Sequence, residues 1–539
     1  MSDQLESRRY LIDIDSISTH QLFTDCLVLG GGVAGLRAAI EAANRGNVII
    51  VCKSSVQDSN TWLAQGGIAA VVEKADSFES HIADTIRTGC GLSDEKIVEL
   101  VVRQGPELIR QLLDWGAEFD MENGHIATTL EGGHTRSRVA HAHGDETGRI
   151  IAQALIGTVK HIPNVKIVEN FFVIDLLTSD NKCLGIIGHD GRGPQIIWAA
   201  NTILATGGAG RIYRETTNPP VATADGIAMA YRAGVVLRDL EFMQFHPTTL
   251  YVAGASRALV TEAVRGEGAF LVDSNGHRFM KDYHESAELA PRDIVSRAIL
   301  SQMLKTNSTH VYLDCRHFEK DRFAKRFPFI NDLCRSFDID ISRNLIPVRP
   351  SAHYMIGGLK TDAGARTNIE NLYACGEAAS TCVHGANRLG SNSLLEGLVF
   401  GKIAGRQASK QIKGRSSHIR HPVVRYHVPH SDRTRLDTND VTNSLRALMW
   451  RNVGITRKAR QLTEAREIIR FWQRYVMDKV FDSPADWECQ NMLTASLLMA
   501  SAAQQREESR GVHFRSDFAA TDEKNFSRHI EVSRQPQAG

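Results

Sequence analysis

The sequence predicts an α/β fold with three parts: a parallel-sheet domain, an α+β domain inserted into it, and a C-terminal helical domain. The first observation is residues 25–53, where an apolar strand, a glycine turn, a helix and a second strand follow one another. The second is residues 242–354, where expected strands and short helices alternate and prolines are scattered, unlike the glycine-rich sequence on either side. The third is the region after residue 430, where apolar residues recur at helical spacing. Because a chain of 539 residues exceeds one hydrophobic core, we expect several domains.

These changes in composition and in the spacing of apolar residues set the expected domain boundaries. They are 1–241 for the first part of the parallel-sheet domain, 242–354 for the inserted capping domain, 355–430 for the second part of the parallel-sheet domain, and 431–539 for the helical domain.

The apolar patterns also predict the main elements. Helices are expected within residues 74–120, and strands over residues 165–177, 184–188 and 196–206. The C-terminal domain should hold roughly three helices, the last ending at Arg510 before Gly511. Residues 1–24 are expected to form a loosely held extension, and residues 412–440 a polar linker.

The composition excludes several classes of protein. The formal net charge is +1, so no global charge attracts nucleic acid or an anionic membrane. No uncharged apolar run reaches the roughly 20 residues that cross a bilayer, and the N-terminus lacks the apolar middle of a secretion signal. The nine cysteines are dispersed without a CxxC pair, and Cys52, Cys90, Cys375 and Cys382 are expected to be small core residues. We therefore expect a cytoplasmic protein with reduced thiols.

A glycine motif follows the first strand. Gly30, Gly32 and Gly35 fit the pattern GxGxxG between the strand CLVL and the helix that begins at Leu36. This arrangement predicts a Rossmann-like domain in which the helix N-terminus faces a pyrophosphate. The acid that usually holds the ribose about 20 residues further on is missing, and Lys53 stands there instead. Lys53 either contacts the ribose or adenine region or is simply solvated.

Three further loops carry the same type of signal. The segment NTWLAQGG, and the glycine turns ATGG and CGE that each follow an apolar strand, are all suited to the carboxyl edge of a sheet. Each by itself could be an ordinary turn. Their number and order favour an extended FAD over NAD alone.

At this point the chain closely resembles the flavoprotein family of succinate dehydrogenase, fumarate reductase and L-aspartate oxidase, and within it the L-aspartate oxidase branch. The resemblance covers residues 24–515 and includes QFHPT, TEAVRG, LAPRD, HGANRLGSNSLLEG and EESRGVHFRSDF. Membrane-bound members attach FAD through a His-Thr pair; Asn60 stands at that position here, which implies noncovalent FAD. The implied cofactor-binding residues are Gly30, Gly31, Gly32, Val33, Ala34, Gly35, Lys53, Asn60, Thr61, Trp62, Leu63, Ala64, Gln65, Gly66, Gly67, Thr206, Gly207, Asp225, Glu377, Ser393 and Leu394.

The resemblance also implies catalytic residues. Arg292, in LAPRD, matches the arginine that donates and accepts the proton, and Glu262 and Arg265 match the relay that reprotonates it. A guanidinium has a pKa above about 12, so this role requires a closed site in which the proton moves together with hydride. The alternative is a structural ion pair of Arg292 with Asp293 or with an acid at a helix N-terminus.

His246, His353, Thr261 and Arg388 resemble the residues that hold both ends of a four-carbon dicarboxylate. An arginine can place two hydrogen bonds on one carboxylate, which suits this substrate class. Glu131 is the candidate for selecting an ammonium group, since an amino acid substrate carries one and succinate does not. Its alternative is an acid in a surface loop.

A metal site is not expected. Its candidates, His134, His141, His143 and Asp145, lack a helical i,i+4 pair and a cysteine partner.

The resemblance implies FAD-dependent oxidation of L-aspartate to iminoaspartate, the first step of NAD biosynthesis through quinolinate. Oxygen or fumarate would reoxidise the flavin, the 242–354 domain would close as a lid, and a transient hand-off to quinolinate synthase is expected. The main alternative is a soluble fumarate reductase or succinate dehydrogenase-type flavoprotein with noncovalent FAD. A subunit that docks an iron–sulfur partner and a flavin-binding module without turnover are less favoured.

Overall fold

The computed structural model describes residues 8–252, 258–412, 421–431 and 433–534. Its largest sheet has the strand order β10, β11, β12, β2, β3, β9, with β19 also paired to β12. The strands are β2 His20–Leu29, β3 Val48–Val51, β9 Val165–Val168, β10 Phe172–Ser179, β11 Lys182–His189, β12 Pro194–Leu204 and β19 Leu372–Ala374. β10, β11 and β12 form an antiparallel meander, whereas the other pairs are parallel.

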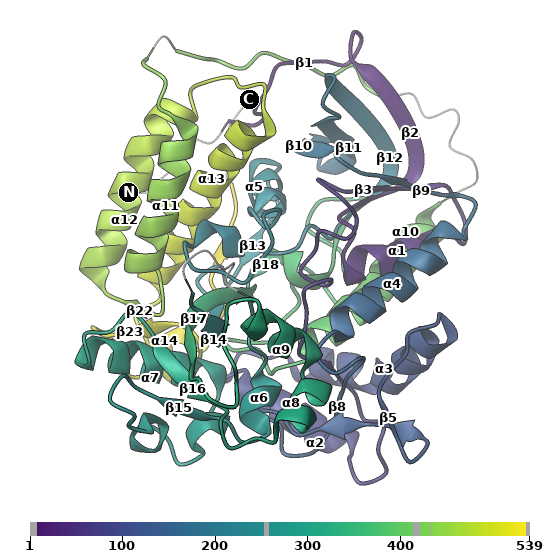
Figure 1. The fold of residues 1–539 in the computed structure, drawn as a ribbon. Coiled ribbons are helices and arrows are strands. Elements are labelled where there is room, and N and C mark those ends of the chain that lie inside the picture. Colours follow the sequence, from purple (N-terminus) through teal and green to yellow (C-terminus); the bar gives the residue numbers. More distant parts are fainter. Residues whose placement is uncertain (1–7, 253–257, 413–420, 432, 535–539) are drawn as a thin grey trace.

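The register of the parallel strands brings their carboxyl ends to one edge. Leu29 pairs with both Val51 and Leu204, and Leu204 pairs with Ala374. The loops that follow these four strands therefore open side by side. Helices α1 (Val33–Ala42) and α10 (Asn392–Gln411) share an apolar core with β2 and β3 and lie against the sheet (Figure 1). This is the Rossmann-like arrangement that the glycine motif predicts.

The inserted region has a sheet and a core of its own. Its antiparallel strands are β14 Met243–Leu250, β17 Ile346–Met355, β16 Val311–Asp314 and β15 Phe270–Val272. Its helices are α6 Glu262–Gly266, α7 Arg292–Lys305, α8 Lys320–Arg326 and α9 Pro328–Arg335. Residues between Leu250 and Val348 form a separate apolar core, whereas Met243, Phe245, Ala352 and Met355 belong to the core of the large sheet. β14 and β17 thus lead from one domain into the other.

Three long helices follow towards the C-terminus: α11 Thr438–Asn452, α12 Ala459–Val476 and α13 Pro484–Gln505. They stand together in Figure 1 and share an apolar core with α5 (Asp225–Arg232) and the β10–β12 meander. Almost the whole length of α13 is buried, because α11, α12 and α5 all pack against it. The expected C-terminal helical region is present, and the domain boundaries stay predictions.

The helices expected between residues 74 and 120 are present as α2 (Phe78–Thr88) and α3 (Glu95–Asp114). Ser77 and Asp94 cap their N-termini through side-chain oxygens, as helix-starting residues do. Helix α4 (Thr147–Lys160) packs between α1 and α3. None of the helices in the described residues combines the length and the apolar content that a bilayer crossing needs.

Three predictions about local structure are wrong. Residues 8–24 are not a loose extension, because Tyr10 and Leu11 are buried, β1 (Ile14–Asp15) pairs with β21 (Arg425–Tyr426), and β2 begins at His20. The single strand expected over residues 165–177 is two strands, β9 and β10. Residues 413–420 and 432 of the expected linker lie outside the described residues.

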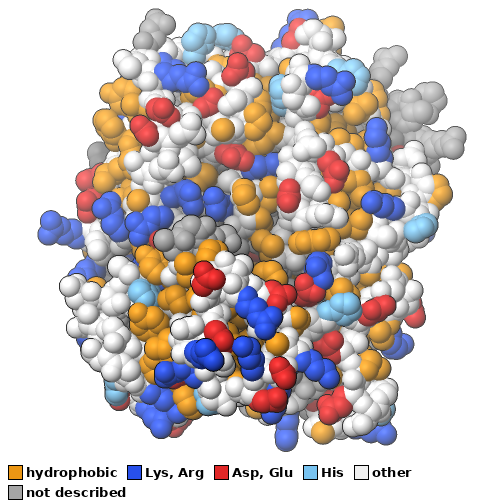
Figure 2. All heavy atoms as spheres, in the orientation of Figure 1, with side chains coloured by type: hydrophobic (Ala, Val, Ile, Leu, Met, Phe, Trp, Pro, Cys, Tyr) orange, Lys and Arg blue, Asp and Glu red, His pale blue; other side chains and the backbone are white. Residues whose placement is uncertain are grey.

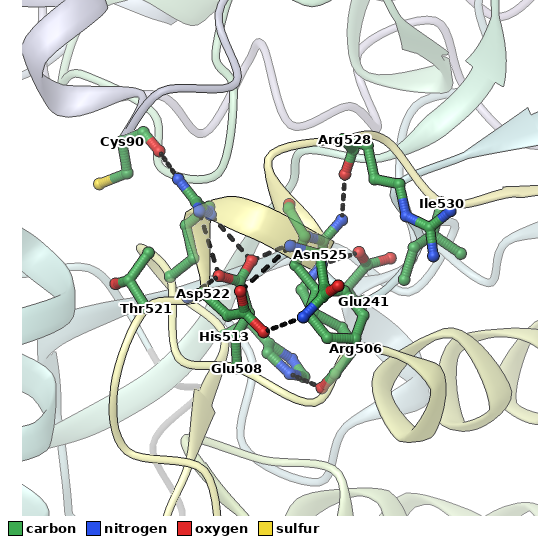
Figure 3. Close-up of polar contacts among 12 residues, drawn as sticks. Cys90, Glu241, Arg506, Glu508, His513, Thr521, Asp522, Asn525, Arg528 and Ile530 are labelled. Atoms are coloured by element: carbon green, nitrogen blue, oxygen red, sulfur yellow. Dashed lines mark hydrogen bonds and ion pairs between the residues drawn. The ribbon is translucent and has the colours of Figure 1, made fainter.

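The third error is the end of the last long helix, which stops at Gln505 rather than at Arg510. Arg506 is fully buried and its guanidinium bonds Glu241 and Glu508, so the chain turns away to form a buried polar network (Figure 3). On the face drawn in Figure 2, acidic and basic side chains lie interspersed, in keeping with the net charge of +1.

Candidate active site

A cavity of about 1210 Å³ runs along the carboxyl edge of the large sheet. This exceeds the roughly 300–1,000 Å³ of ordinary small-molecule pockets and suits a dinucleotide. The predicted cofactor residues that line it are Gly30, Gly31, Gly32, Val33, Ala34, Lys53, Asn60, Thr61, Trp62, Leu63, Ala64, Gln65, Thr206, Gly207, Asp225, Glu377, Ser393 and Leu394. Gly35, Gly66 and Gly67 are not among the lining residues. The structure thus gathers the four predicted loops around one space.

Two glycines explain how the turn approaches the cavity. Gly30 has φ +113°, and a Cβ there would lie 2.1 Å from the carbonyl oxygen of Ala205 on the neighbouring loop. A Cβ on Gly35 would lie 2.0 Å from the carbonyl oxygen of Gly30. Gly35 therefore lets α1 pack onto the turn, and the N-terminus of α1 points its amides towards the cavity, where a pyrophosphate is favoured. These features fit FAD.

Lys53 and Asp225 form an ion pair at the cavity wall. Lys53 Nζ lies 2.7 Å from Asp225 Oδ2 and also pairs with Glu488, and its side chain is 22% exposed. Burial opposes its charge, but the two carboxylates outweigh burial and raise the pKa of Lys53. The solvated interpretation of Lys53 is therefore wrong. An acid does reach this end of the cavity, although it comes from α5 rather than from the end of β3.

Asn60 is hydrogen-bonded to Glu377, and both residues line the cavity. Asn60 Nδ2 donates to Glu377 Oε2 at 3.2 Å, and the amide of Met355 donates to Glu377 Oε1 at 2.9 Å. Burial raises the pKa of Glu377 to about 7. An amide side chain in this position offers no nucleophile for a covalent bond to a flavin.

Beside the cavity, Arg292 is bound to Glu262 rather than to its neighbour in the chain. Arg292 Nε donates to Glu262 Oε2 at 2.6 Å, and Glu262 Oε1 lies 3.2 Å from Arg265 Nη2. Asp293 instead pairs with Arg297 at 2.9 Å. The ion pair of Arg292 with Asp293 is therefore a wrong prediction, and the three predicted relay residues lie in one buried chain. Glu262 is the first residue of α6, so the other structural alternative, a pair with an acid at a helix N-terminus, is not contradicted. Burial opposes ionisation of Glu262, but the two arginines outweigh it and lower the pKa of this carboxyl.

Gln244 connects the two arginines that face the substrate space, and sequence reasoning missed it. Its Oε1 accepts from Arg388 Nη2 at 3.0 Å and from Arg292 Nη1 at 3.3 Å. Gln244 precedes His246 by two residues on β14, so both side chains point to the same face of the strand. That spacing is the signal that could have found it.

The two predicted histidines lie together, with ring centroids 5.2 Å apart. His353 also lines the cavity, so this cluster touches the cofactor space. Burial first, and then nearby positive charge, lowers the pKa of both imidazoles well below the usual range; the charge is mainly that of Arg292 for His246 and those of Arg388 and Arg292 for His353. Both rings are therefore neutral at physiological pH.

Glu131 is 2% exposed, so the surface-loop alternative is wrong. Ser391, another residue that sequence reasoning missed, donates its hydroxyl to Glu131 Oε2 at 3.1 Å. A Cβ on Gly390 would lie 3.2 Å from Arg292 Nη2, 3.5 Å from Glu262 Oε2 and 3.7 Å from Glu131 Oε2. Glu131 therefore belongs to the same cluster as the arginines, and the loop that carries Gly390 and Ser391 lies beside it.

Several buried atoms of this cluster have no hydrogen-bond partner within the described residues. They are His246 Nε2, Thr261 Oγ1 and Glu131 Oε1, whereas Glu262 Oε1 has only its ion pair with Arg265. Leaving a buried polar group unpaired costs about 1–3 kcal/mol, so a set of such atoms in one place indicates a ligand site.

The residues considered for a metal turn to separate partners. His134 contacts Arg138 and the carbonyl of Gly390, and Asp145 accepts the amides of Phe329 and Ile330. Exposed His143 faces Glu118, whereas His141 contacts Thr129.

Comparisons with known proteins agree with this geometry. The family described as FAD binding domain matches residues 25–394, and the family described as fumarate reductase flavoprotein C-term matches residues 442–539. A solved chain of E. coli quinol fumarate reductase is 32% identical, covers 96% of this chain and 95% of its own length, and superposes with a TM-score of 0.89. The fold and the site thus define an FAD-dependent oxidoreductase of the fumarate reductase flavoprotein type.

Among curated relatives, L-aspartate oxidase of Streptomyces coelicolor is 42% identical over 95% of this chain and 92% of its own length. The chloroplastic L-aspartate oxidase of Arabidopsis thaliana is 40% identical over 94% of this chain and 83% of its own length. The chain belongs to the L-aspartate oxidase family.

Proposed function

We propose that the chain oxidises L-aspartate to iminoaspartate, the first step of NAD biosynthesis through quinolinate, with FAD held without a covalent bond. The observation that carries the proposal is the buried cluster of arginines, neutral imidazoles and unpaired polar atoms beside a dinucleotide-sized cavity. When bound, FAD supplies the acceptor for the hydride of the substrate's α-carbon, and oxygen or fumarate reoxidises it.

The cluster can hold both carboxylates of a four-carbon substrate. Arg292 and Arg388 share Gln244 Oε1 and can direct further N–H groups to one carboxylate. His246 Nδ1 lies 3.2 Å from both the amide nitrogen and the carbonyl oxygen of Thr248. In the tautomer in which the amide donates to Nδ1, the proton is on Nε2, and that nitrogen can donate to the second carboxylate together with Thr261. Anchoring both ends orients the α-carbon, and orientation is a large part of the rate.

The proton is handled by the chain from Arg292 to Glu262 to Arg265. The 2.6 Å contact between Arg292 Nε and Glu262 Oε2 gives the guanidinium an immediate partner for proton exchange. Glu262 is ionised, so it can accept what Arg292 releases and return it.

The charge of the cluster favours an amino acid over a simple dicarboxylate. Arg265, Arg292 and Arg388 face Glu131 and Glu262, which leaves one positive charge when the imidazoles are neutral. L-aspartate carries one net negative charge, whereas succinate carries two. Glu131 Oε1 lies 3.5 Å from His141 Nε2 but accepts no hydrogen bond within the described residues, so it can accept one from the ammonium group. A fumarate reductase, whose substrate has no ammonium group, is therefore the less favoured function.

Absorbance spectroscopy of the purified protein tests the proposal. We expect a flavin spectrum that bleaches when L-aspartate is added without air, and peroxide when air is admitted. Denaturation should release the flavin into the supernatant, because Asn60 offers no covalent bond. Bleaching by succinate but not by L-aspartate would assign the site to a succinate dehydrogenase-type flavoprotein.

Closure of residues 242–354 over the substrate, the hand-off to quinolinate synthase and the cytoplasmic location stay predictions.

A further inference from the structure

A second polar arrangement lies outside the cavity, where the C-terminal segment returns to the body of the protein. β24 (Glu531–Val532) pairs with β13 (Leu237–Arg238), which places His529 beside Asp239. His529 Nδ1 lies 2.6 Å from Asp239 Oδ2, and His529 Nε2 lies 3.5 Å from the Sγ of Cys382. Three segments that are far apart in the sequence thus form a Cys–His–Asp series.

Each member is in the position that the chemistry of a reactive thiol needs. The amide of Ile530 donates to Asp239 Oδ1 at 3.2 Å, so the carboxylate is fixed and leaves Oδ2 for the imidazole. Arg506 Nη2 lies 3.9 Å from the same Oδ1, so a second cation stands beside this carboxyl group. A nucleophile, a base within hydrogen-bond reach and a third group that orients the base are the signature of an activated nucleophile.

The hydrogen bonds to Asp239 and then to Cys382 raise the pKa of His529 to about 10. A positively charged imidazolium 3.5 Å from the Cys382 sulfur is the kind of electropositive surrounding in which reactive cysteines are found. Burial raises the pKa of other thiols of this chain, that of Cys90 to about 11 and that of Cys52 to about 12.

Access distinguishes Cys382 as well. Of the nine cysteines, only Cys90 and Cys382 are partly exposed, and the side chain of His529 is 29% exposed. Cys90 has no imidazole partner among the described residues; its Sγ contacts the carbonyl of Thr88. Cys90 is therefore a matched internal control.

We propose that Cys382, His529 and Asp239 form a peroxide-reactive thiolate site. The thiolate sulfur attacks one oxygen of hydrogen peroxide, an S–O bond forms and the O–O bond breaks. The second oxygen leaves as hydroxide and takes the proton of His529 to become water. The sulfur is oxidised by two electrons to a sulfenic acid, and the peroxide is reduced.

The source of the peroxide rests on the proposed function, because oxidation of L-aspartate with oxygen as acceptor releases it at this protein. Cys382 precedes Arg388 by six residues in the loop that also carries Ser391. Its carbonyl accepts the amide of Asp94 at 2.9 Å. Oxidation of Cys382 therefore changes the loop that also carries Arg388 and Ser391, two residues of the substrate cluster.

The test uses the FAD-loaded full chain. Iodoacetamide at pH 7 followed by peptide mapping should label Cys382 about tenfold or more faster than Cys90, because an imidazolium lies beside Cys382 and none lies beside Cys90 among the described residues. His529→Asn and Asp239→Asn should slow the labelling of Cys382 to the rate of Cys90, while Cys90→Ala should leave it unchanged. An unchanged flavin spectrum shows that each variant is folded.

A second measurement adds hydrogen peroxide and traps sulfenic acid with dimedone. We expect a dimedone adduct on Cys382 in the unaltered protein and little in His529→Asn. Equal labelling of Cys382 and Cys90, or no effect of His529→Asn, overturns the proposal. Because the peroxide is added, this result does not depend on the oxidase activity. Failure of the thiolate proposal can therefore be distinguished from failure of the proposed oxidation of L-aspartate.

Discussion

Two buried arginine–glutamate clusters in this protein differ in how completely their polar atoms are paired. In the C-terminal network drawn in Figure 3, Arg506 donates to Glu241 at 2.6 Å and to Glu508 at 2.9 Å. Its remaining donors reach the carbonyls of Phe526 and Arg528. In the substrate-side cluster, by contrast, His246 Nε2, Thr261 Oγ1 and Glu131 Oε1 have no hydrogen-bond partner within the described residues.

The difference indicates that one buried charge cluster stabilises the fold, whereas the other binds a ligand. Arg506, Glu508 and Arg510 use their buried side-chain atoms on one another and on backbone carbonyls, such as that of Cys90. Such a network holds the C-terminal segment in place, and Glu241 lies in it only three residues before Gln244. The substrate-side cluster keeps open hydrogen-bonding positions that a ligand can complete. Two atoms at the C-terminal network, Glu241 Oε2 and Arg457 Nη2, are exceptions to its pairing.

The largest expected effect is on turnover when the substrate-side cluster loses Arg292. Arg292→Leu should lower the rate of L-aspartate oxidation by about 10³-fold or more, because the substrate loses both its proton acceptor and a carboxylate partner. Flavin binding should persist, since Arg292 does not line the cavity. Steady-state kinetics measure the oxidation rate, and the flavin spectrum measures flavin binding. Arg297→Leu, on the same helix but paired with Asp293, is the matched control, and equal losses in both variants would remove Arg292 from the chemistry.

The next effect is on stability when the C-terminal network loses Arg506. Arg506→Leu leaves Glu241 buried without its arginine and removes one of the two arginines that hold Glu508, which should lower the free energy of unfolding by about 3–5 kcal/mol. Urea unfolding monitored by fluorescence measures it. Arg103→Leu, which removes an exposed pair with Glu99, should change stability by less than about 1 kcal/mol. Comparable values for the two variants would contradict a structural role for the network.

A smaller effect tests how the substrate-side cluster selects its ligand. Glu131→Gln should reduce oxidation of L-aspartate by about 10- to 100-fold, because the ammonium loses a charged hydrogen-bond acceptor. Reduction of fumarate, which carries no ammonium, should fall much less. Parallel assays with both substrates measure the ratio, and equal losses would rule out ammonium recognition by Glu131.

The smallest effect concerns Glu377, a buried carboxyl hydrogen-bonded by the amides of Asn60 and Met355 rather than by an arginine. Its pKa is raised to about 7 from 4.5 by burial, so ionisation destabilises the FAD-free fold. The destabilisation is absent below pH 4.5, grows as pH rises and is complete above pH 7. Glu377→Gln should therefore be more stable than the unaltered protein at pH 8, by about 1–3 kcal/mol, and of similar stability near pH 4.5. Urea unfolding at both pH values checks the sign, and a pH-independent difference would contradict it.

The sequence was most informative where structure is local. The strand, glycine turn and helix of residues 25–45, and the amphipathic helix α3, follow from patterns that neighbouring residues set. It was least informative for residues 8–24 and for Arg506, because burial of Leu11 depends on Asp175 and the end of α13 depends on Glu241. Gln244 and Ser391 were missed for the same reason, since their roles come from contacts with Arg388 and Glu131.

By itself the sequence determined the dinucleotide-binding edge and the residue types of the substrate site, because glycine turns and strand periodicity act over a few residues. Only the tertiary structure decided which charges meet. It paired Arg292 with Glu262 instead of Asp293, buried Glu131 beside Ser391, and brought Cys382 to His529. The physical reason is that an ion's partner and its burial depend on distances in space, and these are set by how the domains pack rather than by spacing along the chain.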